Sequence, residues 1–166
     1  MNRPRWRPAY VGVGSNLDGP AEQVARGIVA LDGIADTMLV ASSGFYCSAP
    51  LDGGAQPDYV NAVAALLTRL SPAELLAALQ AVEAAHGRDR SVGHWGPRTL
   101  DLDLLALAGE ELQTDDVILP HPGVATRNFV LLPWCEIAPF YRVPGLATVA
   151  ELVRQLPDEP RIERLA

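Results

Sequence analysis

The sequence predicts an α+β fold of the ferredoxin-like kind: an antiparallel βαββαβ sheet with helices on one face. The first observation is the order of the hydrophobic patterns, which reads strand, helix, strand, strand, helix, strand between residues 9 and 107. The second is the size of the chain, because 166 residues with 49% hydrophobic and 20% charged side chains suit one domain with one core. We therefore expect an N-terminal tail over residues 1–8 and a single domain over residues 9–166, with short C-terminal additions to the sheet.

The first half of the predicted core is a strand, a helix and a second strand. Residues 9–14 are a short apolar run that ends in glycine. A helix begins at Asp18 or Gly19 and ends at Gly33, since it carries an apolar stripe with helical spacing between these residues. The stripe consists of Val24, Ile28 and Leu31. Residues 39–46 then read as a strand.

The second half begins after a loop over residues 49–57, which contains prolines and glycines. Residues 58–70 alternate as a strand. Ser71 opens a capping box, and the helix that follows stops at Gly87. After a second loop, residues 98–107 form the last core strand. The remaining chain predicts a hairpin strand, a turn around two prolines and a helix near residues 149–155.

Charge and composition limit the class of protein. The net charge of −7 argues against a protein that coats nucleic acid or a membrane surface. All 13 basic residues are arginine, so the Gly-Lys-Ser/Thr of a P-loop is absent. No apolar run approaches the roughly 20 residues that span a bilayer, and the start lacks the apolar stretch of a secretory signal. Cys47 and Cys135 lack metal-type spacing, so we expect two free thiols in the cytoplasm.

A pair of aspartates on the last core strand is the first candidate for chemistry. Side chains at i and i+2 of a strand point the same way, so Asp101 and Asp103 share one face. Leu100, Leu102 and Leu104 then face the helices. Neighbouring carboxylates on an open sheet face suit Mg²⁺, including two ions that share ligands. Two solvated aspartates on an edge strand are the alternative, which the pair alone leaves open.

Arginines gather immediately upstream of this pair. Arg88, Arg90 and Arg98 lie within eleven residues, in and after a glycine-rich loop that also carries His94 and Trp95. Guanidinium groups for phosphate oxygens, beside carboxylates that hold metal, are the recurring equipment of phosphoryl transfer. A solvated charged loop is the competing interpretation.

Tyr59 and Asn61 share one face of their predicted strand. A ring that stacks beside an amide that hydrogen-bonds suits a flat heterocycle. The competing interpretation is a core tyrosine and a strand-edge asparagine. Phe129 is either an opposing ring or a core plug, and His121 is either a phosphate contact or a surface histidine in a turn. Polar side chains near the end of the second helix are usually solvated.

In this order, the segments resemble one family, 6-hydroxymethyl-7,8-dihydropterin pyrophosphokinase, an enzyme of folate synthesis. The resemblance covers residues 9–156, and its most specific element is Trp-Gly-Pro-Arg-Thr-Leu-Asp-Leu-Asp at residues 95–103. The other matching segments are Gly14–Leu17, Gln56–Ala62, Gly87–Arg88, Pro120–His121, Arg127, Phe129 and Glu136–Pro139.

The resemblance implies transfer of pyrophosphate from ATP to the hydroxymethyl group of the pterin, with release of AMP. It implies that Asp101 and Asp103 hold two Mg²⁺ ions and act in catalysis together with Arg88 and Arg98. The implied pterin-binding residues are Ser48, Leu51, Tyr59, Asn61, Trp95 and Phe129. The implied ATP-binding residues are Gln80, Glu83, Arg88, Arg90, Trp95, Arg98, His121 and Arg127.

Three other functions stay open at this point. A ligand-binding regulatory module would need no turnover, and ferredoxin-like sheets often serve in that way. A metal-dependent phosphate-ester hydrolase would release phosphate without a pterin acceptor. A pterin aldolase would not require the aspartate pair or the arginine loop. For the pyrophosphokinase we expect ATP and the pterin as small-molecule substrates, no nucleic-acid or membrane partner, and a monomer.

Overall fold

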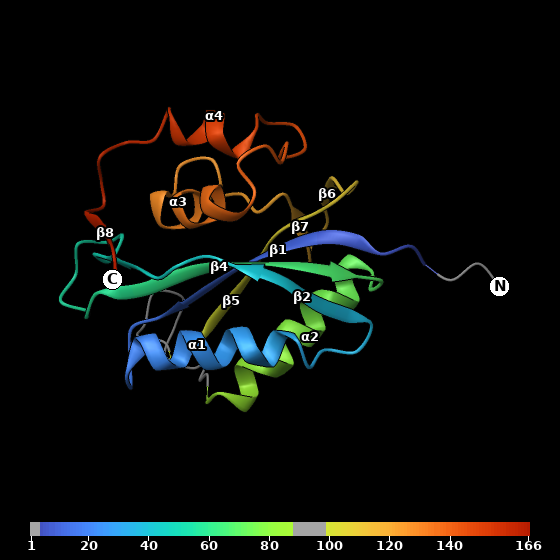
Figure 1. Ribbon diagram of the computed structural model, residues 1–166, viewed down its shortest axis with the longest axis horizontal. Helices are drawn as coiled ribbons and strands as arrows, with labels where there is room; N and C mark the ends of the chain where they lie inside the picture. Colours follow the sequence, from blue (N-terminus) through green and yellow to red (C-terminus); the bar gives the residue numbers. More distant parts are fainter. Residues whose placement is uncertain (1–3, 88–98) are drawn as a thin grey trace.

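The computed structural model describes residues 4–87 and 99–166, and its centre is a six-stranded antiparallel sheet between two helical layers (Figure 1). The strands follow one another across the sheet as β5-β1-β4-β3-β8, and β2 pairs with β4 beside β3. A hairpin of β6 and β7 forms a separate two-stranded sheet. The strands are β1 (Arg7–Ser15), β2 (Thr37–Ser42), β3 (Tyr46–Ser48), β4 (Tyr59–Thr68), β5 (Asp101–Leu107), β6 (Leu112–Gln113), β7 (Ile118–Leu119) and β8 (Ile162–Arg164).

The two predicted helices lie together on one face of this sheet. α1 (Pro20–Leu31) begins after Gly19, and α2 (Pro72–Ala85) begins with the predicted capping box at Ser71. Their apolar sides pack on β1, β4 and β5 and bury one hydrophobic cluster. The leucines at 100, 102 and 104 belong to this cluster, which confirms the predicted alternation of the last core strand.

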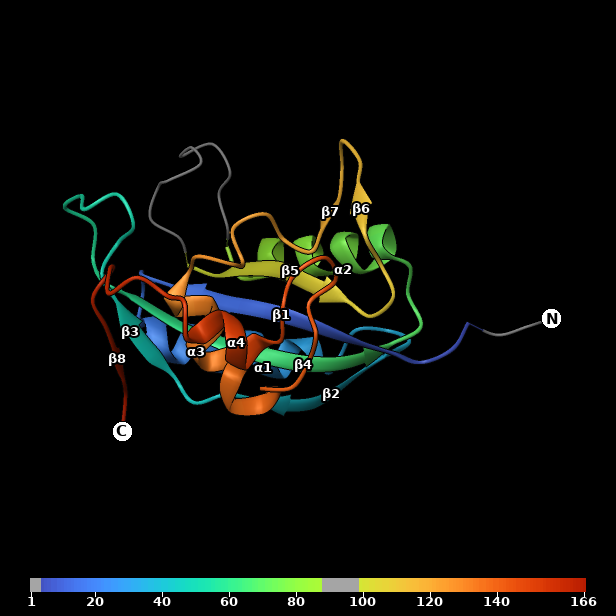
Figure 2. The same ribbon diagram turned by 90° about the horizontal axis from the view of Figure 1, so that it is seen from above.

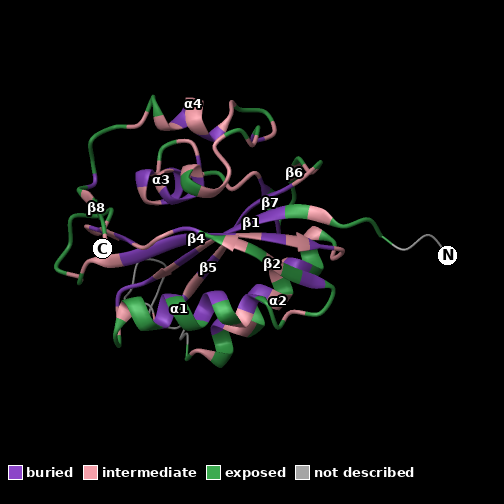
Figure 3. Cartoon of the chain, in the orientation of Figure 1, coloured by how far each residue is buried: buried purple, intermediate pink, exposed green. Residues whose placement is uncertain are grey.

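The opposite face of the sheet is not open, and this part of the prediction was wrong. α3 (Asn128–Ile137) and α4 (Val149–Val153) cover much of it (Figure 1). A second hydrophobic cluster fills the space beneath them, with Trp134 fully buried at its centre. Figure 3 shows the consequence: the central strands β1, β4 and β5 are largely buried, while many exposed residues lie on the outer sides of the helices. In the described part of the chain, α3 and α4 leave one end of this face uncovered, and a cavity lies there.

Several strand boundaries differ from the prediction. The first strand begins at Arg7 rather than at residue 9. The Arg7 guanidinium forms an ion pair with the Glu110 carboxylate at 2.6 Å. The strand predicted over residues 39–46 is two strands, because residues 43–45 leave the regular ladder between β2 and β3. There the Ser43 hydroxyl accepts a hydrogen bond from the Val63 amide at 2.9 Å, so the side chain takes part in the ladder. The last core strand begins at Asp101, three residues later than predicted.

No helix in the described part of the chain is long and apolar enough to cross a membrane.

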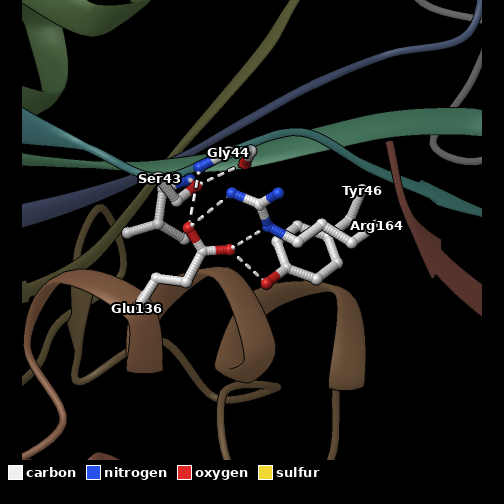
Figure 4. Close-up of polar contacts among 6 residues, drawn as sticks. Ser43, Gly44, Tyr46, Glu136 and Arg164 are labelled. Carbon is white, nitrogen blue, oxygen red and sulfur yellow. Dashed lines mark hydrogen bonds and ion pairs between the residues drawn. The ribbon is translucent and has the colours of Figure 1, made fainter. Parts of the chain in front are cut away.

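The carboxylate of Glu136 fastens α3 to the sheet (Figure 4). It accepts hydrogen bonds from the Tyr46 hydroxyl, from the Gly44 amide at 3.0 Å and from the Arg164 guanidinium at 3.0 Å. Gly44 lies in the connection between β2 and β3, Tyr46 lies in β3, and Arg164 lies in β8. The Arg164 hydrogen bond is the largest of the influences that lower the pKa of Glu136 to about 2, although burial acts in the opposite direction.

This pKa predicts a stability difference that depends on pH. The ionised carboxylate stabilises the fold above the usual glutamate pKa of 4.5, and the effect is lost as pH falls toward 2. We expect Glu136→Gln to lower the free energy of unfolding by about 1–3 kcal/mol at pH 6. The difference between the two proteins should shrink as the pH falls below 4.5 in urea-unfolding measurements. A difference that stays constant from pH 6 to pH 3 would contradict this account.

A second prediction concerns Gly27, where α1 lies closest to the sheet. A Cβ atom at this position would stand 2.7 Å from Leu100 Cδ1, and Leu100 is fully buried. We expect Gly27→Ala to destabilise the protein by about 1–3 kcal/mol through overpacking, although alanine is the better helix former by about 1 kcal/mol. Gly33→Ala is the matched control, because its new Cβ would meet only the Ala30 carbonyl at 3.4 Å. Equal stability of Gly27→Ala and wild type in urea unfolding would refute the close packing.

Candidate active site

A cavity of about 300 Å³ opens at the end of the sheet that α3 and α4 leave uncovered. Its walls come from β1, β4 and β5, from the loop that follows β3 and from the start of α3. It brings together nine of the residues that the sequence proposed for the site. They are Ser48, Leu51, Tyr59, Asn61, Asp101, Asp103, His121, Arg127 and Phe129.

Both aspartates of β5 line this cavity, as their shared face predicts. They pair with glycines of β1, because Asp101 lies opposite Gly14 and Asp103 lies opposite Gly12. Glycine leaves the cavity floor beside each carboxylate without a side chain. The two carboxylates therefore line the same cavity, and the glycines leave space beside them for a bound molecule.

Tyr59 and Asn61 also face the cavity from neighbouring β4 positions. Asn61 is buried, and its amide nitrogen donates a hydrogen bond to the Ser48 hydroxyl of β3 at 2.8 Å. The bond holds the amide group in place, with its nitrogen toward Ser48. Gly14 keeps room on the other side, because a Cβ there would stand 3.1 Å from Asn61 Oδ1. Asn61 thus presents a fixed hydrogen-bonding edge to whatever fills the cavity.

The start of α3 forms the opposite wall. Phe129 lines the cavity, and the guanidinium carbon of Arg127 lies 5.9 Å from the centroid of its ring. Arg127 passes directly over Gly123, where a Cβ atom would stand 2.5 Å from its Nε atom. The helix therefore supplies an aromatic ring with a cation beside it.

His121 lies in the turn after β7, next to Asp101 and Arg127. Its Nδ1 atom accepts a hydrogen bond from the Gly123 amide at 3.1 Å, so the proton of the neutral ring is on Nε2. Burial lowers the pKa of His121, the Arg127 charge lowers it further, and Asp101 opposes the change. The ring is thus a neutral donor with its Nε2–H available for an anionic oxygen.

A second cavity of about 270 Å³ adjoins the first. Asp103, His121 and Pro122 line both. The other walls of the second cavity are largely apolar side chains of β5 and β7, together with the polar pair Asp115 and Asp116. Two binding spaces therefore meet at one carboxylate and one histidine.

Neither Gln80 nor Glu83 lines these cavities in the part of the chain that the structure describes. Gln80 is exposed on α2. Glu83 is buried, with 2% of its surface exposed, and its carboxylate accepts a hydrogen bond from the Leu102 amide at 2.8 Å. The expectation of a solvated side chain was wrong for Glu83, because the edge of β5 offers its backbone donor to this residue.

Four predicted site residues lie outside the described residues. They are Arg88, Arg90, Trp95 and Arg98. Their roles stay predictions from the sequence.

Sequence reasoning gave no role to several residues that shape the cavity. Gly12 and Gly14 form its floor, and the signal was their spacing of two on an otherwise apolar strand. Asn16 is buried after β1, and its amide nitrogen lies 3.2 Å from Gln56 Oε1 and 3.3 Å from the Pro57 carbonyl oxygen. It joins the end of the 49–57 loop to β1.

Comparison with known proteins agrees with this geometry. The family model described as 7,8-dihydro-6-hydroxymethylpterin-pyrophosphokinase (HPPK) matches residues 10–139. The chain belongs to the HPPK family. It is an ATP-dependent diphosphotransferase that moves pyrophosphate from ATP to hydroxymethyldihydropterin in folate biosynthesis, which confirms the predicted reaction.

Two relatives carry the name 2-amino-4-hydroxy-6-hydroxymethyldihydropteridine pyrophosphokinase. The protein of Haemophilus influenzae is 43% identical over 155 residues, which cover 93% of this chain and 96% of the relative. The protein of Pseudomonas aeruginosa is 45% identical over 156 residues, with coverage of 94% and 95%. Membership of this HPPK family removes the regulatory module, the hydrolase and the aldolase as alternatives.

Solved structures of the Plasmodium falciparum HPPK-DHPS protein share the fold. One has a TM-score of 0.73 at 11% identity and another has 0.70 at 12% identity. Each match covers 93% of this chain, which spans less than half of the longer protein, 46% and 44%. At such a low sequence identity, this similarity supports the fold of the chain and says nothing about its function.

The surroundings of His121 predict its titration. We expect its pKa, measured by NMR on the ring protons, to lie below 6.5. Arg127→Ala should raise this pKa, and Asp101→Asn should lower it further, because the two neighbours act in opposite directions. Arg154→Ala, which removes an equal charge from the end of α4, is the control and should leave the titration unchanged. A pKa at or above 6.5 in the wild type would contradict the described environment.

Proposed function

We propose that the 300 Å³ cavity is the place where pyrophosphate passes from ATP to the pterin. The observation that carries the proposal is that one space is lined by the aspartate pair, by Asn61 with its fixed amide and by the rings of Tyr59 and Phe129. A flat heterocycle and a metal-bound phosphate require these two kinds of side chain within one site.

The pterin occupies the part of the cavity between β4 and α3. Tyr59 and Phe129 provide apolar faces for its ring system, and Asn61 provides hydrogen bonds to its polar edge. Ser48 orients Asn61 through the 2.8 Å hydrogen bond. Leu51, in the loop after β3, is 46% exposed and covers the ring from the outside.

ATP approaches from the second cavity. Asp103 and His121 line both spaces, so a nucleotide whose base lies in the second cavity brings its phosphates to the aspartates. The neutral His121 donates its Nε2–H to a phosphate oxygen, and Arg127 contributes positive charge on the pterin side. Arg88, Arg90, Trp95 and Arg98 complete the donor side in this proposal.

The aspartates fit a divalent cation. Hard carboxylate oxygens at i and i+2 of one strand are the ligands that Mg²⁺ prefers. In the described part of the chain, no group of three or more acidic, histidine or cysteine side chains forms a closed metal site. We propose that Asp101 and Asp103 would hold two Mg²⁺ ions together with the phosphate oxygens of ATP. When bound, they neutralise the charge that develops on the transferred group.

The protein's own residues then position the reaction. The rings and Asn61 hold the pterin so that its hydroxymethyl oxygen points toward the aspartates, and His121 with Arg127 holds the phosphates in line with it. The hydroxyl oxygen attacks the β-phosphorus of ATP and passes its proton to the Asp103 carboxylate. The bond from the β-phosphorus to the oxygen that bridges it to the α-phosphorus breaks, and AMP leaves with that oxygen. Water is excluded because the pterin fills the cavity mouth beneath the 49–57 loop.

We also propose that residues 7–166 form one ferredoxin-like domain that works as a monomer in the cytoplasm, since β1 begins at Arg7 and not at residue 9. The order β5-β1-β4-β2, with α1 and α2 on one face, supports the fold assignment. Both cysteines are free thiols, which fits a reducing compartment.

The aspartate pair gives the sharpest test of this site. We expect Asp101→Asn and Asp103→Asn each to lower kcat by at least about a hundredfold, because each removes a charge from the metal and phosphate site. The measurement is AMP release from Mg-ATP, with and without the hydroxymethyldihydropterin. In the wild type, AMP should appear only when the pterin is present.

Asp158→Asn is the matched control, since this exposed aspartate precedes the C-terminal strand and lies outside both cavities. Far-UV circular dichroism should show the same fold in all variants. Wild-type turnover in either Asp101→Asn or Asp103→Asn would remove the pair from the proposed site.

A further inference from the structure

The C-terminal segment, residues 160–165, lies beyond the part of the chain that the family model matches, which ends at residue 139. We propose that this segment is a positioning element that holds the pterin side of the cavity in its binding geometry. The proposal rests on the pterin-binding role given above to Tyr59, Asn61 and Phe129. Figures 1 and 2 show β8 and the 49–57 loop at the same end of the sheet.

The backbone of the segment supports the strand that carries Ser48. β8 pairs with β3 so that Ile162 lies opposite Ser48. Beyond this pair, the Ala49 amide donates to the Arg161 carbonyl oxygen at 3.0 Å. β3 has only three residues, and it lies between β4 and β8 in the sheet. The loop over the cavity begins directly after β3. The position of Ser48, and with it the orientation of Asn61, therefore depends on β8.

Two side-chain contacts fix α3 at both of its ends. Asn128, the first residue of the helix, is 3% exposed and donates its amide to the Pro160 carbonyl oxygen at 2.7 Å. It directly precedes Phe129. At the other end, Glu136 accepts from Arg164 at 3.0 Å (Figure 4). The segment thus holds the helix that presents the Phe129 ring.

A third contact reaches the start of β4. The Arg161 guanidinium lies 3.1 Å from Asp58 Oδ2, and Asp58 directly precedes Tyr59. Both side chains are substantially exposed, 65% and 41%, so this ion pair contributes little to global stability. Its consequence is local, because it sets where the chain enters β4 and hence where the Tyr59 ring lies.

These contacts join the segment to β3, to β4 and to α3, the three elements that supply the pterin side. The donor side, formed by β5 and the His121 turn, is held by other contacts, such as the His121 amide to the Leu105 carbonyl oxygen at 2.9 Å. Loosening the segment should therefore weaken pterin binding selectively. If the segment only stabilised the fold, loosening it would change the KM for the pterin and the KM for ATP to the same extent.

The test uses Arg161, whose pair with Asp58 can be changed without opening the core. We expect Arg161→Ala to raise the KM for the pterin by up to about fivefold. This is the change in affinity that follows from losing the free energy of one exposed ion pair. The KM for ATP and the melting temperature should stay at wild-type values. Arg161→Lys, which keeps the charge, should retain most of the pterin affinity. The charge-reversed pair Asp58→Arg with Arg161→Asp should recover affinity that each single reversal loses.

Two further variants separate the possible failures. Arg154→Ala removes an equal charge elsewhere and should leave both KM values unchanged. Asn61→Ala should raise the KM for the pterin, and if it does not, the proposed pterin site fails and this inference fails with it. If Asn61→Ala raises that KM but Arg161→Ala leaves it unchanged, only the positioning role is overturned. Parallel increases in both KM values for Arg161→Ala, or a lowered melting temperature without a change in pterin KM, would likewise overturn it.

Discussion

The antiparallel pairing of β5 with β1 positions the aspartate pair of the proposed active site. The pairing places Asp101 and Asp103 opposite Gly14 and Gly12, so the carboxylates face a floor without side chains. The same alternation sends the intervening leucine into the core beneath α1 and α2. A shift of one residue would exchange the two sets and bury charge in the core, which is prohibitively unfavourable. The same alignment of β5 with β1 therefore buries the leucines in the core and places the aspartates in the cavity.

The parts of the fold that follow simple periodicity were predictable from the sequence. The capping box at Ser71 and the apolar stripe of α1 mark helices by local chemistry, and the structure contains both. The alternation in β4 and β5 likewise identified which side chains share a face, so Tyr59 joins Asn61 and Asp101 joins Asp103 in the cavity. These features depend on residues within a few positions of one another, and a sequence displays them directly.

In the second helical layer, α4 (Val149–Val153) confirms the helix predicted near residues 149–155, but α3 could not be predicted in this way. The ten residues of α3 are almost continuously apolar, Pro133 lies inside the helix, and its N-cap provides no side-chain hydrogen bond. A pattern without periodicity and with a helix breaker does not indicate a helix. What stabilises α3 is contact with distant parts of the chain: the sheet face beneath Trp134, and the hydrogen bonds of Glu136 to β3 and β8. Such long-range contacts also explain why the position of Phe129 followed from the resemblance rather than from spacing.

The burial of Glu83 has a consequence for the behaviour of the enzyme at high concentration. Among the described residues, β5 is the last strand at its side of the sheet, and an uncovered strand there would offer its backbone to another molecule. At this edge the Leu102 amide donates a hydrogen bond to the Glu83 carboxylate, and the Leu105 carbonyl oxygen accepts a hydrogen bond from the His121 amide. A foreign strand would have to displace a buried carboxylate and the turn that carries His121 before it could add to the sheet. The strand that carries the aspartates is thereby protected from templating aggregation, although it lies at the rim of the molecule.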